Sequence, residues 1–293
     1  MQLHLVDATY ELFRAHFAPR PATLTHDGRN VGAVVGLLYS LLALLRDEGA
    51  THVGCATDQV IRSFRNDLYA DYKTDAGVPG ELLDQFPLAE RAMEAMGLVV
   101  WPMVEFEADD ALATAVARWS EAPGVERTNI CTPDKDLAQC VRGERVVLRD
   151  RRRERTIDEA GVAAKWGVAP TSIPDYLALV GDAADGFPGL PGWGAKSASA
   201  VLARFGTLEA IPHDAAEWHV NVRSAGTLNA ALRAQWQDAI LFRRLATLRS
   251  DAPLPQRRPA ELEWRGAHRS AFTDLCRELG QDRLAERPHM WQD

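Results

Sequence analysis

The sequence predicts an α/β fold with a mostly parallel central sheet, followed by a helical region. Short apolar runs typical of buried strands occur at residues 3–6, 52–56, 98–103, 129–132 and 145–148. Helix-like segments separate most of them, and strands that alternate with helices favour a parallel sheet covered on both faces. After about residue 155 the strand signals fade, and helices broken by Pro and Gly remain. We therefore expect two domains, residues 1–155 and residues 156–293.

Three segments of the first domain have the pattern of helices. Residues 31–46 are apolar nearly all round, which indicates a buried helix, whereas residues 82–96 and 108–119 have the i, i+3, i+4 spacing of amphipathic helices. The apolar stretch 31–45 is shorter than the ~20 residues that a membrane span needs. The first eleven residues lack the pattern of an export signal. We therefore expect a cytoplasmic protein that has no membrane partner.

The charge balance restricts the class of function. The chain has 33 Lys and Arg against 41 Asp and Glu, a formal charge of −8, which disfavours a uniformly basic nucleic-acid binder. The exception is a protein whose acids gather where metal ions neutralise them. Four cysteines show no Cys-x-x-Cys pairing, so neither a zinc site nor a disulfide framework is expected.

Carboxylates follow several of the expected strands. Asp7 ends the first run, Asp58 follows the second, and Asp134 and Asp136 close the run at 129–133. Ligands of open parallel sheets bind at the carboxyl ends of the strands, so these acids are expected to be neighbours in space. For any single Asp the simpler interpretation is a turn or cap residue. That interpretation does not account for the whole set.

Two further groups of acids belong to the same pattern. Glu107, Asp109 and Asp110 open the helix at 108–119, where acids also favour the positive end of the helix dipole. Asp182 and Asp185 have the i, i+3 spacing that places two side chains on one side of a helical turn.

The set of nine acids predicts a metal centre. Gathered carboxylates repel one another unless hard divalent cations lie among them, and oxygen ligands suit Mg²⁺ or Mn²⁺. Two or more such ions can activate a water and stabilise the leaving oxygen of a phosphodiester. Without the nine acids, 33 basic residues stand against 32 acidic ones, so the rest of the chain can present basic patches to DNA.

A glycine hairpin runs from residue 190 into a helix that continues to about Phe205. Backbone N–H groups at such a helix start can bind a DNA phosphate, and a nearby lysine adds charge. The simpler alternative is a plain helix–helix turn. The hairpin is not a Walker A loop, because Ala195 separates Gly194 from Lys196. The DNA-binding candidates are Gly192, Gly194, Lys196 and Ser197.

These motifs resemble those of the bacterial 5′ nucleases, namely flap endonucleases and the 5′-3′ exonuclease domain of DNA polymerase I. The resemblance lies in Leu-Val-Asp at 5–7, Ser-Phe-Arg at 63–65, Tyr-Lys at 72–73, the acidic motifs and the glycine hairpin, in the family's order over residues 1–250. It implies a PIN-like nuclease domain with an arch at about 62–92, then a helix-three-turn-helix element at about 175–210. We expect a stand-alone member of the family.

The resemblance also implies roles for individual residues. All nine acids match family metal ligands: Asp7, Asp58, Glu107, Asp109, Asp110, Asp134, Asp136, Asp182 and Asp185. Lys73 is expected to contact the scissile phosphate, Tyr72 to stack on an unpaired base, and Arg65 to belong to the same catalytic group. The hairpin would hold K⁺ through backbone carbonyls. Ala76 stands where the family usually has an arginine.

The sequence therefore predicts a divalent-metal-dependent 5′-3′ exonuclease and flap endonuclease of DNA replication and repair. Its partners would be DNA with a 5′ flap, nick or overhang, together with replication and repair proteins, and the protein would be a monomer. Two alternatives stay open. One is a PIN-type ribonuclease, which would not need the glycine hairpin. The other is a non-catalytic structure-specific DNA-binding protein, in which nine retained acids would only weaken binding.

Overall fold

The computed structural model describes residues 1–19 and 21–292 and divides into two compact units. The first unit contains residues 1–61, 75–132 and 250–293, and the second contains residues 62–74 and 133–249. No helix in the described part of the chain is both long and apolar enough to cross a membrane.

The first unit is built on four parallel strands in the order β3-β2-β1-β4. The strands are β1 (Gln2–Asp7), β2 (His52–Asp58), β3 (Val99–Met103) and β4 (Arg127–Cys131). The helices are α1 (Ala8–His16), α2 (Gly32–Arg46), α4 (Gly80–Leu83), α5 (Phe86–Ala95) and α6 (Ala108–Trp119). The predicted alternation of strands and helices is confirmed here. Helix α1 lies where the sequence analysis placed no element.

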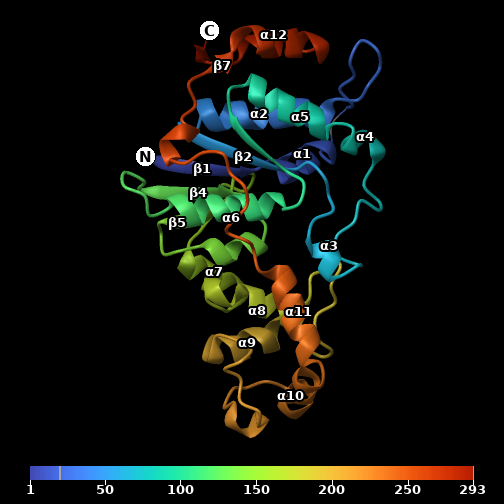
Figure 1. Cartoon of the computed structure of the whole chain (residues 1–293), viewed down its shortest axis with the longest axis vertical. Coiled ribbons are helices and arrows are strands. Elements are labelled where there is room, and N and C mark those ends of the chain that lie inside the picture. Colours follow the sequence, from blue (N-terminus) through green and yellow to red (C-terminus); the bar gives the residue numbers. More distant parts are fainter. Residues whose placement is uncertain (20, 293) are drawn as a thin grey trace. The chain divides into compact units, whose positions relative to one another are not determined.

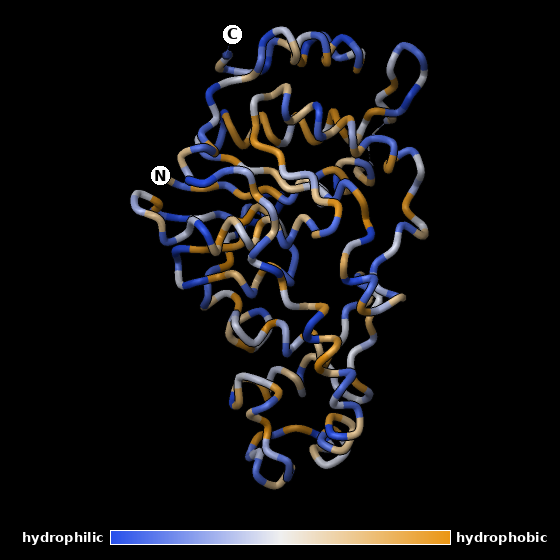
Figure 2. Tube along the Cα trace, viewed as in Figure 1, coloured by the Kyte–Doolittle hydropathy of each residue, from blue (hydrophilic) through white to orange (hydrophobic). Residues whose placement is uncertain are grey.

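The sheet of the first unit is covered on both faces. Helices α2 and α5 lie on one side of the strands and α6 on the other (Figure 1). The core includes Val6, Val53 and Cys55 of the strands together with Leu38 and Leu41 of α2, all buried. In Figure 2 the hydrophobic parts of the trace gather along the strands and the helices beside them. Burial on both faces explains why the strands read as continuous apolar runs.

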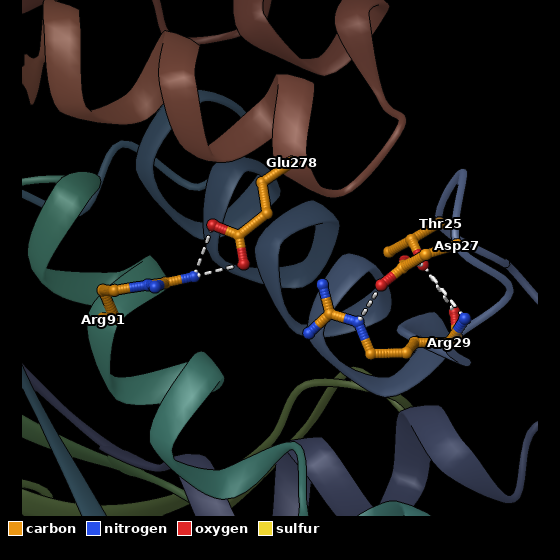
Figure 3. A network of polar contacts seen from close by, with 5 residues as sticks. All are labelled: Thr25, Asp27, Arg29, Arg91 and Glu278. Atoms are coloured by element: carbon orange, nitrogen blue, oxygen red, sulfur yellow. Dashed lines mark hydrogen bonds and ion pairs between the residues drawn. The ribbon is translucent and has the colours of Figure 1, made fainter.

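The last segment of the chain packs back onto the first unit. It contains α12 (Arg269–Glu278), the two-stranded sheet of β7 (Ala267–His268) and β8 (Trp291–Gln292), and 3-10 helices at Pro259–Leu262 and Asp282–Glu286. The indole N–H of Trp264 donates to the Met96 carbonyl over 2.8 Å. An ion pair joins Arg91 of α5 to Glu278 of α12 over 2.6 Å (Figure 3). This segment is therefore part of the first unit rather than a separate tail.

The loop between α1 and α2 is closed by its own polar contacts. The Thr25 N–H donates to the Arg29 carbonyl over 2.9 Å, and the Arg29 guanidinium donates to Asp27 over 2.9 Å (Figure 3). The hydroxyl of Thr25 donates to the same carboxylate.

The second unit is mainly helical, as predicted for the region after residue 155. Its helices are α3 (Arg65–Leu68), α7 (Glu159–Trp166), α8 (Ile173–Val180), α9 (Ala195–Phe205), α10 (Ala225–Ala234) and α11 (Trp236–Ala246). Short 3-10 helices occur at Asp136–Cys140, Pro170–Ser172 and Ala215–Glu217. Two antiparallel strands, β5 (Val146–Asp150) and β6 (Arg155–Ile157), form a hairpin. Strand β6 escaped the sequence analysis because it is three residues long and begins in a run of arginines.

Candidate metal centre and nucleic-acid interface

The first unit places Asp7 at the junction of β1 and α1. One carboxylate oxygen accepts a hydrogen bond from the Tyr10 N–H over 2.8 Å, which caps α1. The other accepts from the Thr132 hydroxyl over 3.0 Å. The side chain is 6% exposed. The carboxylate is thus fixed at the carboxyl edge of the sheet, as predicted, and it also performs the capping role of the simpler interpretation.

The same edge holds Asp58 beside the first turn of α6. An oxygen of Asp58, at the end of β2, accepts from the Ala108 N–H over 2.7 Å. Glu107 precedes α6, and its own N–H donates to Asp110 over 3.0 Å in a capping box. Asp109 is half-buried in the same turn. The structure therefore brings the acids of two distant segments together, although Asp110 also stabilises its own helix.

The second unit contains a tight cluster of three acids. Oxygens of Asp136, Asp182 and Asp185 lie within 4.8 Å of one another. Asp134 lies next to this cluster, because its carboxylate accepts from the Asp136 N–H over 2.9 Å. These four acids thus come from two segments about fifty residues apart in the chain.

The expectation that Asp182 and Asp185 lie on a helical turn is wrong. Helix α8 ends at Val180, and Gly181 takes a φ of +80°, which stops the helix. Asp182 then pairs with Phe187 as an isolated antiparallel bridge, with N–H to carbonyl distances of 2.8 and 3.0 Å. The two acids therefore lie in a tight turn, which the i, i+3 spacing alone does not distinguish from a helix.

The carboxylates of the cluster repel one another, and a cation placed among them would reduce this repulsion. Burial, and then the carboxylates of Asp134, Asp185 and Asp182, raise the pKa of Asp136 well above its usual value. The ammonium of Lys135 forms an ion pair with Asp182. Burial lowers the pKa of Lys135, but the hydrogen bond to Asp182 and the nearby acids outweigh it, so that the pKa is raised.

The residues present fit a divalent metal ion. The donor set is carboxylate oxygen only, which suits Mg²⁺, Mn²⁺ or Ca²⁺. The Oδ1 atom of Asp136 is buried and has no hydrogen-bond partner within the described residues. A buried acceptor without a hydrogen bond lowers the stability of the folded protein, and coordination of a cation would supply the missing partner.

A backbone hydrogen bond joins Lys73 to the loop that carries Asp185. Its N–H donates to the carbonyl of Asp185 over 2.9 Å. The amide of Asn66 donates to the carbonyls of Tyr72 over 2.7 Å and of Lys73 over 3.2 Å. Gly186 permits the approach, since a Cβ atom there would lie 2.3 Å from the Asp71 carbonyl oxygen. The sequence analysis identified Lys73 but gave no role to Asn66 or Gly186.

The side chains of Arg65 and Tyr72 are buried, at 1% and 2% exposed. The Arg65 guanidinium donates to the carbonyls of Leu245, over 2.8 Å, and Thr247, over 3.3 Å. It also lies 4.7 Å from the centroid of the Phe64 ring. The structure therefore gives Arg65 a role in joining α3 to the end of α11. The catalytic roles of Arg65 and Tyr72 stay predictions.

The glycine hairpin leads into α9 as expected. Gly192 has a φ of +79°, and Gly194 caps the helix. The hydroxyl of Ser197 donates to the Gly194 carbonyl over 3.0 Å and accepts from its N–H over 3.1 Å. The indole of Trp193 is buried and donates to the Leu228 carbonyl of α10 over 3.1 Å. Lys196 is exposed.

The hairpin borders a cavity of about 570 Å³. Gly192, Gly194, Lys196 and Ser197 line one side, and Arg223 and Thr227 line the other. The sequence analysis missed the last two, because they lie outside the hairpin motif and only the packing of α10 brings them to it.

Two family models together match residues 2–270. Residues 2–167 match the "5'-3' exonuclease, N-terminal resolvase-like domain", and residues 168–270 match the "5'-3' exonuclease, C-terminal SAM fold".

Curated relatives are bacterial DNA polymerases I. The chain is 38% identical to that of Rhizobium leguminosarum over 260 residues, which are 86% of this chain and 25% of the relative. It is 30% identical to that of Bacillus caldotenax over 290 residues, which are 98% of this chain and 32% of the relative. The chain thus spans about a quarter to a third of the length of these relatives.

Solved structures share the fold. The T5 D15 protein co-crystallised with metal ions superposes with a TM-score of 0.66 at 16% identity, covering 98% of this chain and 97% of that one. The catalytic core of Rad2 in complex with DNA substrate superposes with a TM-score of 0.61 at 14% identity, covering 95% and 88%. At these identities the likeness establishes the fold.

Proposed function

The chain belongs to the 5′-3′ exonuclease family, and we propose that it is a structure-specific 5′ nuclease that needs Mg²⁺ or Mn²⁺ and hydrolyses DNA at 5′ flaps, nicks and overhangs. The observation that carries the proposal is the cluster of buried Asp136 and Asp182 with half-buried Asp185, whose carbonyl accepts a hydrogen bond from the Lys73 N–H. DNA replication and repair in the bacterial cytosol is the setting that fits its relatives.

The nine acids are proposed as two ligand groups, one in each unit. The first unit supplies Asp7, Asp58, Glu107, Asp109 and Asp110, and the second supplies Asp134, Asp136, Asp182 and Asp185. When bound, divalent cations at such groups supply activation of a water and stabilisation of the leaving oxygen. The protein's own contribution is to hold the carboxylates in place through the backbone hydrogen bonds described above.

Lys73 is proposed to stabilise the charge that develops on the scissile phosphate. A positioned cation lowers the barrier most when it needs no reorganisation during the reaction. The hydrogen bonds from Asn66 and to Asp185 hold the Lys73 backbone in this way. Tyr72 and Arg65, both buried, would act through the position of this segment, and base stacking by Tyr72 would require its ring to become exposed.

The glycine hairpin is proposed to hold duplex DNA by its backbone. Exposed Lys196 and the N–H groups at the start of α9 are suited to phosphate oxygens, without regard to sequence. K⁺ bound through hairpin carbonyls would add to this contact. Since the hydroxyl of Ser197 is used within the hairpin, its contribution would be to shape the turn.

Cleavage of three matched substrates tests the proposal. The protein is incubated with a 5′-flap DNA duplex, the same duplex with an RNA flap, and the flap strand alone, in Mg²⁺ and then in Mn²⁺. We expect cleavage of the DNA flap near the junction, leaving a 5′-phosphate and a 3′-hydroxyl. The variant Asp136→Ala should give no product, and Asp274→Ala, which removes an exposed acid of α12, should cut like the wild type.

The alternatives predict different outcomes. A ribonuclease would cut the RNA flap in preference to the DNA flap. A non-catalytic protein would bind the flap and give no product with either metal. A native mass spectrum of the protein, with and without the flap, tests whether it is a monomer.

A further inference from the structure

The most cationic segment of the chain lies outside both groups of residues described so far. Residues 149–155 contain five arginines and two acids, a net charge of +3 in a chain of net charge −8. The structure places them at the turn between β5 and β6, where Arg152, Arg153 and Arg155 are exposed. We call the residues from Arg149 to Arg155 the arginine hairpin.

The arginine hairpin forms a pocket with helix α7. Arg153, Arg155 and Thr156 line one side of a cavity of about 560 Å³, and Gly161 and Lys165 of α7 line the other. Two acids at the start of α7 accept backbone hydrogen bonds: Asp158, the N-cap, from the Gly161 N–H over 2.8 Å, and Glu159 from the Gly143 N–H over 2.8 Å. Neither acid lines the pocket.

Positive charge exceeds negative charge around this pocket. Asp150 pairs with Arg153 over 3.1 Å and is the acid that lines the pocket. Burial is the main reason that the pKa of Lys165 is lowered; Asp150 and Asp134 oppose this effect, and the positive charges of Arg153 and Arg155 add to it. A surface at which cations are crowded in this way attracts a polyanion.

Helix α7 joins the pocket to the glycine hairpin. The hydroxyl of Ser199, the fifth residue of α9, donates to the Trp166 carbonyl at the end of α7 over 2.6 Å. Gly167 follows with a φ of +73°, and a Cβ atom there would lie 2.8 Å from the Cβ of Ser199. The end of α7 therefore contacts α9 three residues after Lys196. In Figure 1, α7, α8 and α9 follow one another through this unit.

The length of α7 is close to the rise of a few base pairs of one DNA duplex. Helix α7 has 8 residues, which gives a length of about 12 Å at 1.5 Å per residue. That length matches about four base pairs of B-DNA, at ~3.4 Å per step along a strand. The arginine hairpin precedes α7, and the end of α7 contacts α9, so cationic residues occur on neighbouring elements of this unit.

We propose that the arginine hairpin and Lys165 form a second phosphate-binding surface, which holds the continuation of the duplex that the glycine hairpin grips. The inference rests on the proposed binding of duplex DNA by the glycine hairpin and extends it to a longer footprint. The contact is with the sugar-phosphate backbone and so is independent of sequence.

The test measures affinity against duplex length. Flap DNAs with duplex arms from about 6 to about 20 base pairs, a range from about half a helical turn to about two turns, are titrated in Ca²⁺ by fluorescence anisotropy. The triple variant R152Q/R155Q/K165Q leaves the Arg153–Asp150 ion pair intact. The control R277Q/R283Q/R287Q makes the same charge change on exposed arginines of the C-terminal segment. Circular dichroism confirms that both fold.

We expect wild-type affinity to rise once the arm reaches the arginine hairpin. The triple variant should lose that rise, with a Kd at least ~10-fold higher for long arms at 0.1 M salt and unchanged for the shortest arm. Its salt dependence, the slope of log K against log salt, should be shallower by about 2 to 3, since each phosphate contact contributes ~0.9. The control should behave like the wild type at every length.

Three results would overturn the inference. One is an equal loss at all arm lengths, and another is no loss at all. The third is binding of polyglutamate through the arginine hairpin with no effect of arm length, which would identify an acidic protein as the partner. If the wild type binds no flap DNA of any length, the proposed function itself fails, which is a separate outcome.

Discussion

Replacing Asp136 by Asn should stabilise the metal-free protein. Oxygens of Asp182 and Asp185 lie within 4.8 Å of the cluster atoms of Asp136. Each repulsion is worth about 3.5 kcal/mol at that distance with an effective dielectric constant of ~20. The positive charge of Lys135 offsets part of the summed repulsion between the carboxylates. We therefore expect Asp136→Asn to raise the free energy of unfolding by about 3 kcal/mol. For a protein of this size that is roughly 6 to 12 °C in Tm.

The effect depends on pH in a definite direction. Because the pKa of Asp136 is raised in the folded protein, the folded state favours the protonated carboxyl. Its contribution to stability is complete below the unfolded pKa of about 3.9 and is lost as the pH rises through the folded pKa. The difference in Tm between Asp136→Asn and the wild type should therefore be small near pH 4 and grow as the pH rises.

Binding of a divalent metal ion should make the wild type more stable than Asp136→Asn. A cation present at 1,000 times its Kd stabilises the wild type by ~4.1 kcal/mol, which exceeds the advantage of about 3 kcal/mol that Asp136→Asn has without metal. Asp136→Asn should gain much less from the metal, because it loses a ligand. The assay is thermal unfolding followed by circular dichroism, from pH 4 to 8, in EDTA and in Mn²⁺, with Asp274→Asn as the exposed control. A lower Tm for Asp136→Asn in EDTA at pH 7.5 would refute the reasoning.

Three other substitutions test separate contacts. Arg65→Met should cost about 3 kcal/mol in urea unfolding, because two buried carbonyls lose a charged donor; a cost below ~1 kcal/mol would contradict the anchoring role. Gly186→Ala combines a φ of +83° with a Cβ 2.3 Å from the Asp71 oxygen, so it should shift Lys73 and lower the single-turnover rate at least ~10-fold. DNA affinity in Ca²⁺ should hardly change, and an unchanged rate would count against the coupling. Trp193→Phe removes one buried hydrogen bond and should cost about 1 kcal/mol, whereas a stabilised variant would show that this bond is dispensable.

The fold class and the acids at the strand ends were predictable because they depend on local pattern. Apolar runs of four to six residues determine buried strands, and Asp7 follows one of them directly and Asp58 follows another after a single residue. Helix α9 was predicted with its observed end at Phe205, since the hairpin glycines mark its start. Helix α1 was missed because its apolar face is narrow and it begins directly after β1 without a turn.

Other features required the tertiary structure. Arg65 contacts carbonyls 180 and 182 residues away, and no local spacing encodes such a partner. The same holds for the bond between the Lys73 N–H and the Asp185 carbonyl. The turn at Asp182 depends on pairing with Phe187, which the i, i+3 spacing of the acids does not reveal.

The sequence by itself determined which residue types the protein offers for chemistry: nine acids, a lysine after a tyrosine, and a glycine hairpin. The tertiary structure decided which of them meet, and it showed that the arginines at 149–155 share a pocket with Lys165. The physical reason is the range of the forces involved. Periodicity and capping act over a few residues, whereas burial, ion pairing and close backbone approach depend on segments that only folding brings together.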